Sequence, residues 1–146
     1  MSARRIVLCL PSNTPFFDPM PEETAKRDVE LSAEWDGTPA GVVGWAEGGW
    51  AALALAAEHK QLVDRLVLVS APAPETEPKA IDLDSIQAKT LLLYGMHEEA
   101  VSHTDRNWWR DRLNARFEMV PNGGHDILVQ KWPRILSHLA PHTLRK

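Results

Sequence analysis

Residues 40–57 have the sequence AGVVGWAEGGWAALALAA, in which a short apolar run leads through a cluster of glycines into a segment rich in alanine and leucine. The run at 41–44 predicts a buried strand. Residues 49–60 predict a helix that is apolar around most of its circumference and is therefore deeply buried. The joint between the two holds three glycines, at positions 44, 48 and 49. Glycine is favoured there because a strand and a helix approach closely only where side chains are small.

Four more apolar runs predict strands, at residues 6–10, 66–69, 90–94 and 116–120. Most of these runs are continuous rather than alternating, as is typical of a parallel sheet whose two faces are both covered. Further helices are predicted at residues 21–35 and 104–113, and near the C-terminus, where apolar residues recur at spacings of three and four. Residues 72–84 contain three prolines and predict a loop. Strands that alternate with helices imply a single α/β domain, residues 1–146, with right-handed crossovers.

The composition excludes several classes of protein. The chain has 146 residues, of which 44% are hydrophobic, so it is long enough for one domain and too apolar for a disordered chain. Its formal net charge of −4 gives no electrostatic reason to expect nucleic acid or an anionic membrane as a partner. No apolar run approaches the ~20 residues that span a bilayer.

Cys9 is the single cysteine, and its apolar surroundings predict an unreactive, buried thiol. A chain with one cysteine has no internal disulfide, which fits a reducing compartment. The apolar run at 6–10 is shorter than the core of a signal peptide. We therefore expect a cytoplasmic location.

The joint Gly44-Trp45-Ala46-Glu47-Gly48 resembles the nucleophile elbow, G-x-S-x-G, of the α/β-hydrolase family. Three later segments are similar to further family motifs, in the family's order: a strand within 62–72, the strand KTLLLYG at 89–95, and VPNGGHD at 120–126 with the histidine loop. The resemblance covers roughly residues 41–139. It implies a three-layer fold with a mostly parallel sheet of about five to six strands flanked by helices. The short segment 72–84 implies that there is no lid domain.

The resemblance also implies roles for individual residues. His125 would be the general base and Glu98 the carboxylate that orients it, with Glu99 and Asp126 as alternative acids. The backbone N–H of Glu47 would be one oxyanion donor. The backbones of Ser12 and Asn13 are candidates for the second donor, although the family's usual His-Gly signature is absent there. Trp45 and Trp50 flank the elbow, and either line an acyl pocket or pack in the core.

Ala46 stands at the position of the family's serine, and a methyl group cannot attack a carbonyl. Two interpretations follow. In the first, the chain is a serine hydrolase for esters, thioesters or amides whose nucleophile has been replaced. In the second, it is a natural relative without the reaction that binds a small molecule or a protein. The histidine loop and the acid favour the first interpretation, and the short N-terminal region favours the second. Neither makes the chain as it stands an active enzyme, and neither requires a cofactor.

About forty residues precede the elbow strand, fewer than half of what the family usually has there. This difference predicts missing N-terminal strands and an exposed apolar face, which either a second copy of the chain, in a homodimer, or another partner would cover. Of the adjacent Trp108 and Trp109, one is expected to pack inward and the other to face outward or toward a partner. The His, Glu and Asp residues at 97–105 match no usual zinc spacing, so no metal site is predicted.

Overall fold

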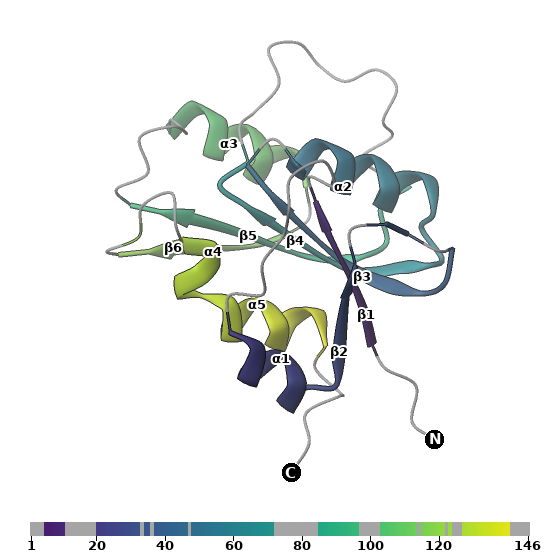
Figure 1. Cartoon of the computed structure of the whole chain (residues 1–146). Coiled ribbons are helices and arrows are strands. Elements are labelled where there is room, and N and C mark those ends of the chain that lie inside the picture. The colour runs from purple at the N-terminus through teal and green to yellow at the C-terminus, as the bar shows by residue number, and fades with distance from the viewer. Residues whose placement is uncertain are drawn as a thin grey trace.

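The structure is a computed structural model of the whole chain, in which residues 5–10, 20–32, 34–35, 37–46, 48–71, 85–96, 103–113, 115–121, 123 and 127–140 are described. For residues 103–106 only the backbone is described. Figure 1 shows one sheet between two layers of helices.

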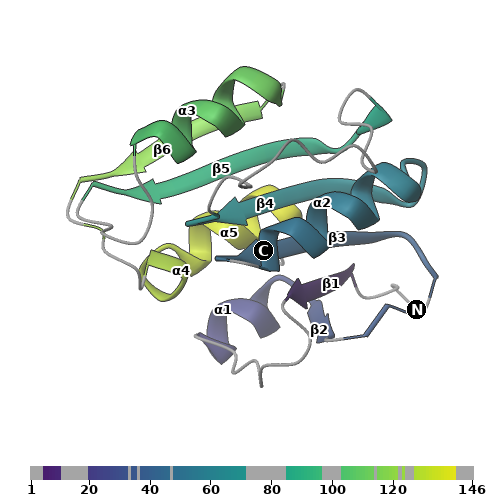
Figure 2. The same cartoon turned by 90° about the horizontal axis from the view of Figure 1, so that it is seen from above.

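The helices and strands follow one another along the chain as β1 (Arg5–Leu10), α1 (Pro21–Lys26), β2 (Val29–Ser32), β3 (Ala40–Trp45), α2 (Gly48–Glu58), β4 (Val63–Val69), β5 (Lys89–Gly95), α3 (His103–Arg112), β6 (Ala115–Val120), α4 (Ile127–Gln130) and α5 (Trp132–Leu139). The six strands form one sheet in the order β2-β1-β3-β4-β5-β6, and every neighbouring pair is parallel. Seen from above in Figure 2, the strands lie side by side and their arrowheads point the same way. The predicted parallel sheet is therefore confirmed, and each of the five predicted strands is one to three residues longer than its apolar run.

The predicted helix at 21–35 is wrong in its second half. Helix α1 ends at Lys26, and Asp28 turns the chain with a φ of 55° in the left-handed region. Strand β2 follows, pairing with β1 at the edge of the sheet. The side chains of Val29 and Leu31 alternate with polar ones, and both pack into the core. The segment before the elbow strand thus contains two strands rather than the one predicted.

The core is divided by the sheet into two clusters. One cluster joins the sheet to α4 and α5 and contains Trp132, and the other joins it to α2 and α3 and contains Trp109. Successive residues of β4 alternate between them, since Val67 belongs to the first and Leu68 to the second. This alternation explains why the strand sequences are continuously apolar, and it confirms the three-layer arrangement. Among the described residues between β4 and β5, none belongs to a lid domain.

Three more sequence predictions are confirmed within these layers. Cys9 is buried and 1% exposed. Trp109 is fully buried and its Nε1 donates a hydrogen bond to the Ala71 carbonyl at 2.9 Å, whereas Trp108 is only half-buried. The apolar C-terminal segment is helical, in two pieces, and Pro133 lies in the first turn of α5. No described helix has the length and apolar character that crossing a bilayer requires.

Polar contacts tie the amino ends of the strands to α5. The Nε of Arg5 donates to the Leu139 carbonyl at 3.0 Å, and Arg65 Nη1 donates to the His138 carbonyl at 3.4 Å. The Nε2 of His138 donates to the Lys89 carbonyl at 2.8 Å. We call this set of contacts, made by Arg5, Arg65 and His138, the amino-end clamp.

The clamp predicts a pH dependence of stability. Burial lowers the pKa of His138 below its ordinary value of 6.5, and Arg65 and Arg134 lower it further, against the opposite effect of the Lys89 carbonyl. The unfolded chain therefore takes up the proton first as the pH falls below about 6.5, and the contribution of His138 to stability is lost there. We expect urea unfolding to show lower stability at pH 5.5 than at pH 7.5. The difference should be smaller in His138→Gln, and an identical difference in both chains would contradict this assignment.

Candidate active site

At the predicted elbow, the central strand β3 is followed by a turn at Ala46 and then by helix α2. Ala46 follows β3 directly, with a φ of 52° in the left-handed region that a residue with a Cβ rarely adopts. Its N–H donates to the Val69 carbonyl at 2.8 Å, and its own carbonyl accepts from Gly49 N–H at 3.1 Å in the first turn of α2. The turn at Ala46 is therefore fixed on both sides by backbone hydrogen bonds.

The glycines of the elbow are required by close approach. A Cβ on Gly44 would lie 2.7 Å from Gly49 Cα, 2.8 Å from the Gly48 oxygen and 2.9 Å from Ala52 Cβ. A Cβ on Gly49 would lie 2.8 Å from the Cβ of Ala71, which follows β4. Side chains at these two positions would push α2 away from β3 and β4. The close approach of α2 to the strands is therefore the reason for glycines at these positions, as the sequence analysis expected.

Backbone hydrogen bonds connect the carboxyl ends of the four strands β3 to β6. Ala46 N–H bonds to the Val69 carbonyl, and Ser70 N–H donates to the Leu93 carbonyl at 2.9 Å. Met96 N–H donates to the Val120 carbonyl at 3.0 Å, which also accepts from Gly123 N–H at 3.0 Å. The elbow and the ends of the two strands that precede the acid and histidine motifs therefore belong to one edge, which we call the carboxyl edge.

The motif side chains themselves lie outside the described residues: Ser12, Asn13, Glu47, Glu98, Glu99, His125 and Asp126. The strands that lead to them end at the carboxyl edge, at Leu10, Gly95 and Val120. The structure thus describes the frame of the predicted site, and the roles of these residues remain predictions.

Trp45 and Trp50 are separated by the sheet. Trp45 is half-buried against the cluster that contains Trp132. Trp50 is half-buried against the other cluster, where its ring centroid lies 4.9 Å from that of Trp109. Because the two rings belong to different faces, they do not line one wall together, and this favours core packing over a shared acyl pocket.

Ser70 is a candidate residue that the sequence analysis missed. It follows β4 directly, has a φ of 53° and is 0% exposed. Its Oγ has no hydrogen-bond partner within the part of the chain that the structure describes. The only signal in the sequence is a hydroxyl at the end of the apolar run VLVS, on the strand beside the elbow strand.

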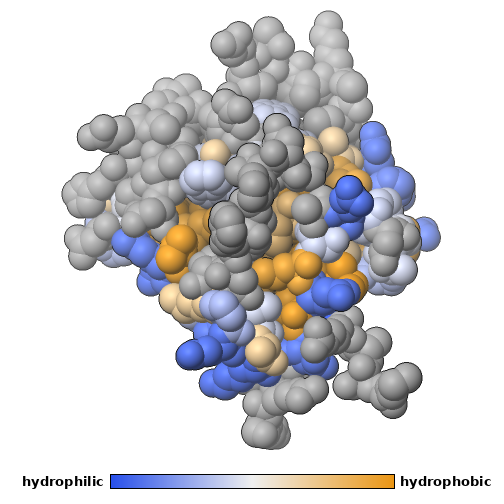
Figure 3. Space-filling model, viewed as in Figure 1, coloured by the Kyte–Doolittle hydropathy of each residue, from blue (hydrophilic) through white to orange (hydrophobic). Residues whose placement is uncertain are grey.

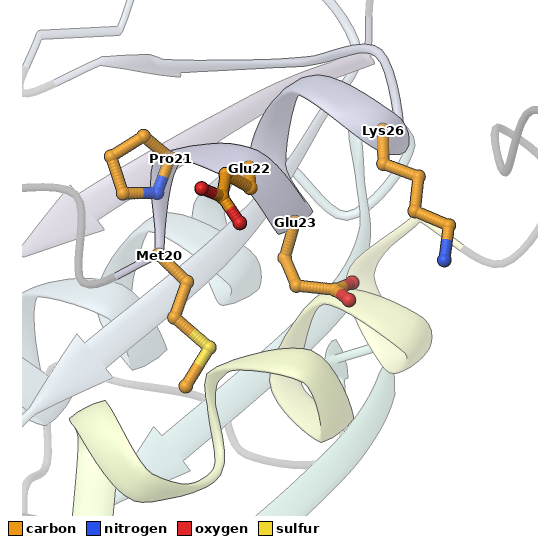
Figure 4. A pocket seen from close by; sticks show the side chains of 5 residues that line it. All are labelled: Met20, Pro21, Glu22, Glu23 and Lys26. Carbon is orange, nitrogen blue, oxygen red and sulfur yellow. The ribbon is translucent and has the colours of Figure 1, made fainter.

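A surface pocket of about 660 Å³ lies beside helix α1. Its described lining residues are Met20 and four residues of α1, including Glu22, Glu23 and Lys26. Figure 4 shows Met20 and Glu23 extending toward the C-terminal helices. Among the described residues, no group of three or more His, Cys, Asp or Glu side chains is arranged to hold a metal ion.

Known proteins resemble this chain in structure rather than in sequence. No family model matches it, and no curated protein is similar to it in sequence. A Thermoplasma acidophilum protein described as a predicted CIB-like hydrolase is 17% identical, with a TM-score of 0.67, over 90% of this chain and 83% of that one. A protein of unknown function from Agrobacterium tumefaciens, named as a candidate α/β hydrolase, is 13% identical, with a TM-score of 0.68, over 98% and 89%.

A third solved structure is the thioesterase domain from the curacin biosynthetic pathway. It is 14% identical, with a TM-score of 0.66, over 92% of this chain and 90% of that one. Together with the six-stranded parallel sheet and the elbow at β3, these similarities show that the chain has the α/β-hydrolase fold. Identities this low establish the fold and not the reaction.

Proposed function

We propose that the chain carries the acyl-hydrolase site of its fold, with Ala46 in place of the nucleophilic serine, so that it binds an ester, thioester or amide without hydrolysing it. The observation that carries this proposal is the left-handed φ of 52° at Ala46, within G-x-A-x-G at a strand-to-helix turn. This conformation costs an alanine about 1 kcal/mol. It places the methyl group at the position where the nucleophile elbow otherwise carries a serine hydroxyl.

In the proposed reaction, a serine hydroxyl at position 46 attacks the carbonyl carbon while His125 accepts its proton. Glu98 orients the imidazole, and the N–H of Glu47 stabilises the oxyanion of the tetrahedral intermediate. His125 then returns the proton to the leaving group, and water hydrolyses the acyl intermediate by the same route. The chain order elbow, acid, histidine supports this assignment.

A second candidate is a binding protein without chemistry, for a small molecule or a protein partner. Ala46 itself favours it, because the chain as it stands has no hydroxyl at the elbow. Both candidate functions use a site at the carboxyl edge. They differ in whether the base, the acid and the oxyanion donor are assembled there for catalysis.

A homodimer and a cytoplasmic location remain proposals. Figure 3 shows hydrophobic residues in the middle of one face, between the two helical layers. Among the described residues, the exposed large hydrophobic side chains are Met96 at 59% and Val129 at 49%. Their exposure supports the proposed dimer. The buried thiol of Cys9 agrees with a reducing compartment.

Ala46→Ser tests the proposed function. We expect this variant to hydrolyse short p-nitrophenyl esters on the order of 10²-fold or more above the unchanged chain, because the hydroxyl completes a triad. A fluorophosphonate probe should label the variant and leave the unchanged chain unlabelled. Ala46→Gly is the matched control, since it alters the same residue, relieves the left-handed φ and supplies no hydroxyl. A folded Ala46→Ser protein that is neither labelled nor active would favour the binding protein instead.

A further inference from the structure

Ser70 follows β4 at the position that corresponds to Ala46 after β3. The register pairs Trp45 with Val69, so Ala46 and Ser70 are the next residues on two neighbouring strands. Neighbouring strands lie about 4.8 Å apart. Both residues have left-handed backbones, with φ of 52° and 53°. The elbow thus has a second strained residue beside it, and this one carries a hydroxyl.

The backbone around Ser70 is held by four hydrogen bonds. The Val69 carbonyl accepts from Ala46 N–H, and Ser70 N–H donates to Leu93. The Ala71 carbonyl accepts from Tyr94 Oη at 2.8 Å and from Trp109 Nε1 at 2.9 Å. These bonds hold Ser70 in a conformation that a serine rarely adopts, and none of them involves its hydroxyl.

That hydroxyl differs from the other buried Ser and Thr hydroxyls in the described ranges. Thr90 Oγ1 donates to the Ala88 carbonyl at 3.0 Å, and Thr24 Oγ1 donates to the Met20 carbonyl at 3.2 Å and accepts from Trp132 Nε1 at 3.0 Å. The Oγ of Ser70 is equally buried, and the described residues offer it no partner. Buried hydroxyls are nearly always bonded, and an unbonded one lowers stability, so this one requires an explanation.

We propose that Ser70 is a ligand-binding residue of the elbow site, whose hydroxyl donates a hydrogen bond to an oxygen of the acyl group held over Ala46. This inference rests on the proposed function and names the atom of the ligand that the site selects. A carbonyl or carboxylate oxygen satisfies the hydroxyl, whereas a hydrocarbon leaves it unbonded. Because Ser70 is covered in the chain without ligand, the ligand reaches it with a local rearrangement.

The test compares two ligands on two proteins. p-Nitrophenyl butyrate carries the carbonyl, and p-nitrophenyl butyl ether lacks it. Binding of each to the unchanged chain and to Ser70→Ala is measured by quenching of tryptophan fluorescence, without turnover because Ala46 has no hydroxyl. We expect Ser70→Ala to raise the Kd of the ester about fivefold to tenfold and to leave the Kd of the ether unchanged. Its unfolding temperature should stay equal or rise, since an unbonded buried hydroxyl is removed.

Ser85→Ala is the matched control, because its Oγ donates to the Ala57 carbonyl at 3.3 Å, away from the carboxyl edge. It should leave both Kd values unchanged. An equal Kd for the ester in the unchanged chain and in Ser70→Ala, an equal weakening of ester and ether, or no ester binding at all would each overturn the inference. If Ala46→Ser is inactive while Ser70→Ala weakens the ester alone, the hydrolase proposal fails and the role of Ser70 stands.

Discussion

Replacing His125 by alanine in the Ala46→Ser variant is expected to lower kcat/KM for p-nitrophenyl esters by about 10³-fold or more. The introduced hydroxyl is a weak nucleophile until a base accepts its proton, and His125, within the VPNGGHD motif, is the base that we propose. Steady-state hydrolysis of p-nitrophenyl butyrate measures the loss.

His59→Ala, in the same Ala46→Ser background, is the matched control for this experiment. His59 lies next to α2, with its ring 4.4 Å from that of Trp35, and it is not a residue of the proposed site. Its replacement should change kcat/KM less than about threefold, because this half-buried side chain is not part of the proposed chemistry. Equal losses in the two histidine variants would contradict the assignment of His125 as the base.

Gly44→Ala is expected to destabilise the fold by about 3 kcal/mol. The added Cβ would lie 2.7 Å from Gly49 Cα and 2.8 Å from the Gly48 oxygen, both of which are backbone atoms of α2. These atoms do not move aside as a flexible side chain does, because Gly49 packs in turn against Ala71. Relief of the overlap requires α2 to shift as a unit from the sheet. Urea denaturation with matched m-values measures the loss.

Gly37→Ala separates this overlap from the general cost of replacing a glycine. A Cβ on Gly37 has no atom within 4 Å, and its φ of +85° leaves only backbone strain, worth about 1 kcal/mol. If Gly44→Ala costs no more than Gly37→Ala, the close approach of β3 and α2 does not explain the glycines of the elbow.

The sequence was most informative where one physical requirement dominates. Continuous apolar runs indicated the buried strands, and the glycines at positions 44 and 49 indicated contact between β3 and α2, which the distances now explain. Strand β2 was missed because its two core residues, Val29 and Leu31, alternate with polar ones inside a polar segment. The turn that separates it from α1 depends on a left-handed Asp28, for which the sequence carries no glycine signal.

The candidate site was predicted as an order of motifs along the chain, and the elbow is the motif that the described residues show. The motif pattern places Ala46 at the turn, and the structure finds it there. No pattern identifies Ser70, because a serine at the end of a strand is ordinary. Only its burial, its φ and its unbonded hydroxyl, seen together, distinguish it. Likewise, the sequence left open how Trp45 and Trp50 pack, since the face of the sheet on which each lies depends on the register of β3 and on the path of α2.

The amino-end clamp gives the two ends of the sheet different evolutionary freedom. Arg5, Arg65 and His138 tie the last turns of α5 to the ends of the strands opposite the elbow. Substitutions there are expected to alter how firmly the chain holds together, whereas substitutions at the carboxyl edge would alter the ligand that we propose it binds. The stability of the fold and the choice of ligand can therefore change independently of each other.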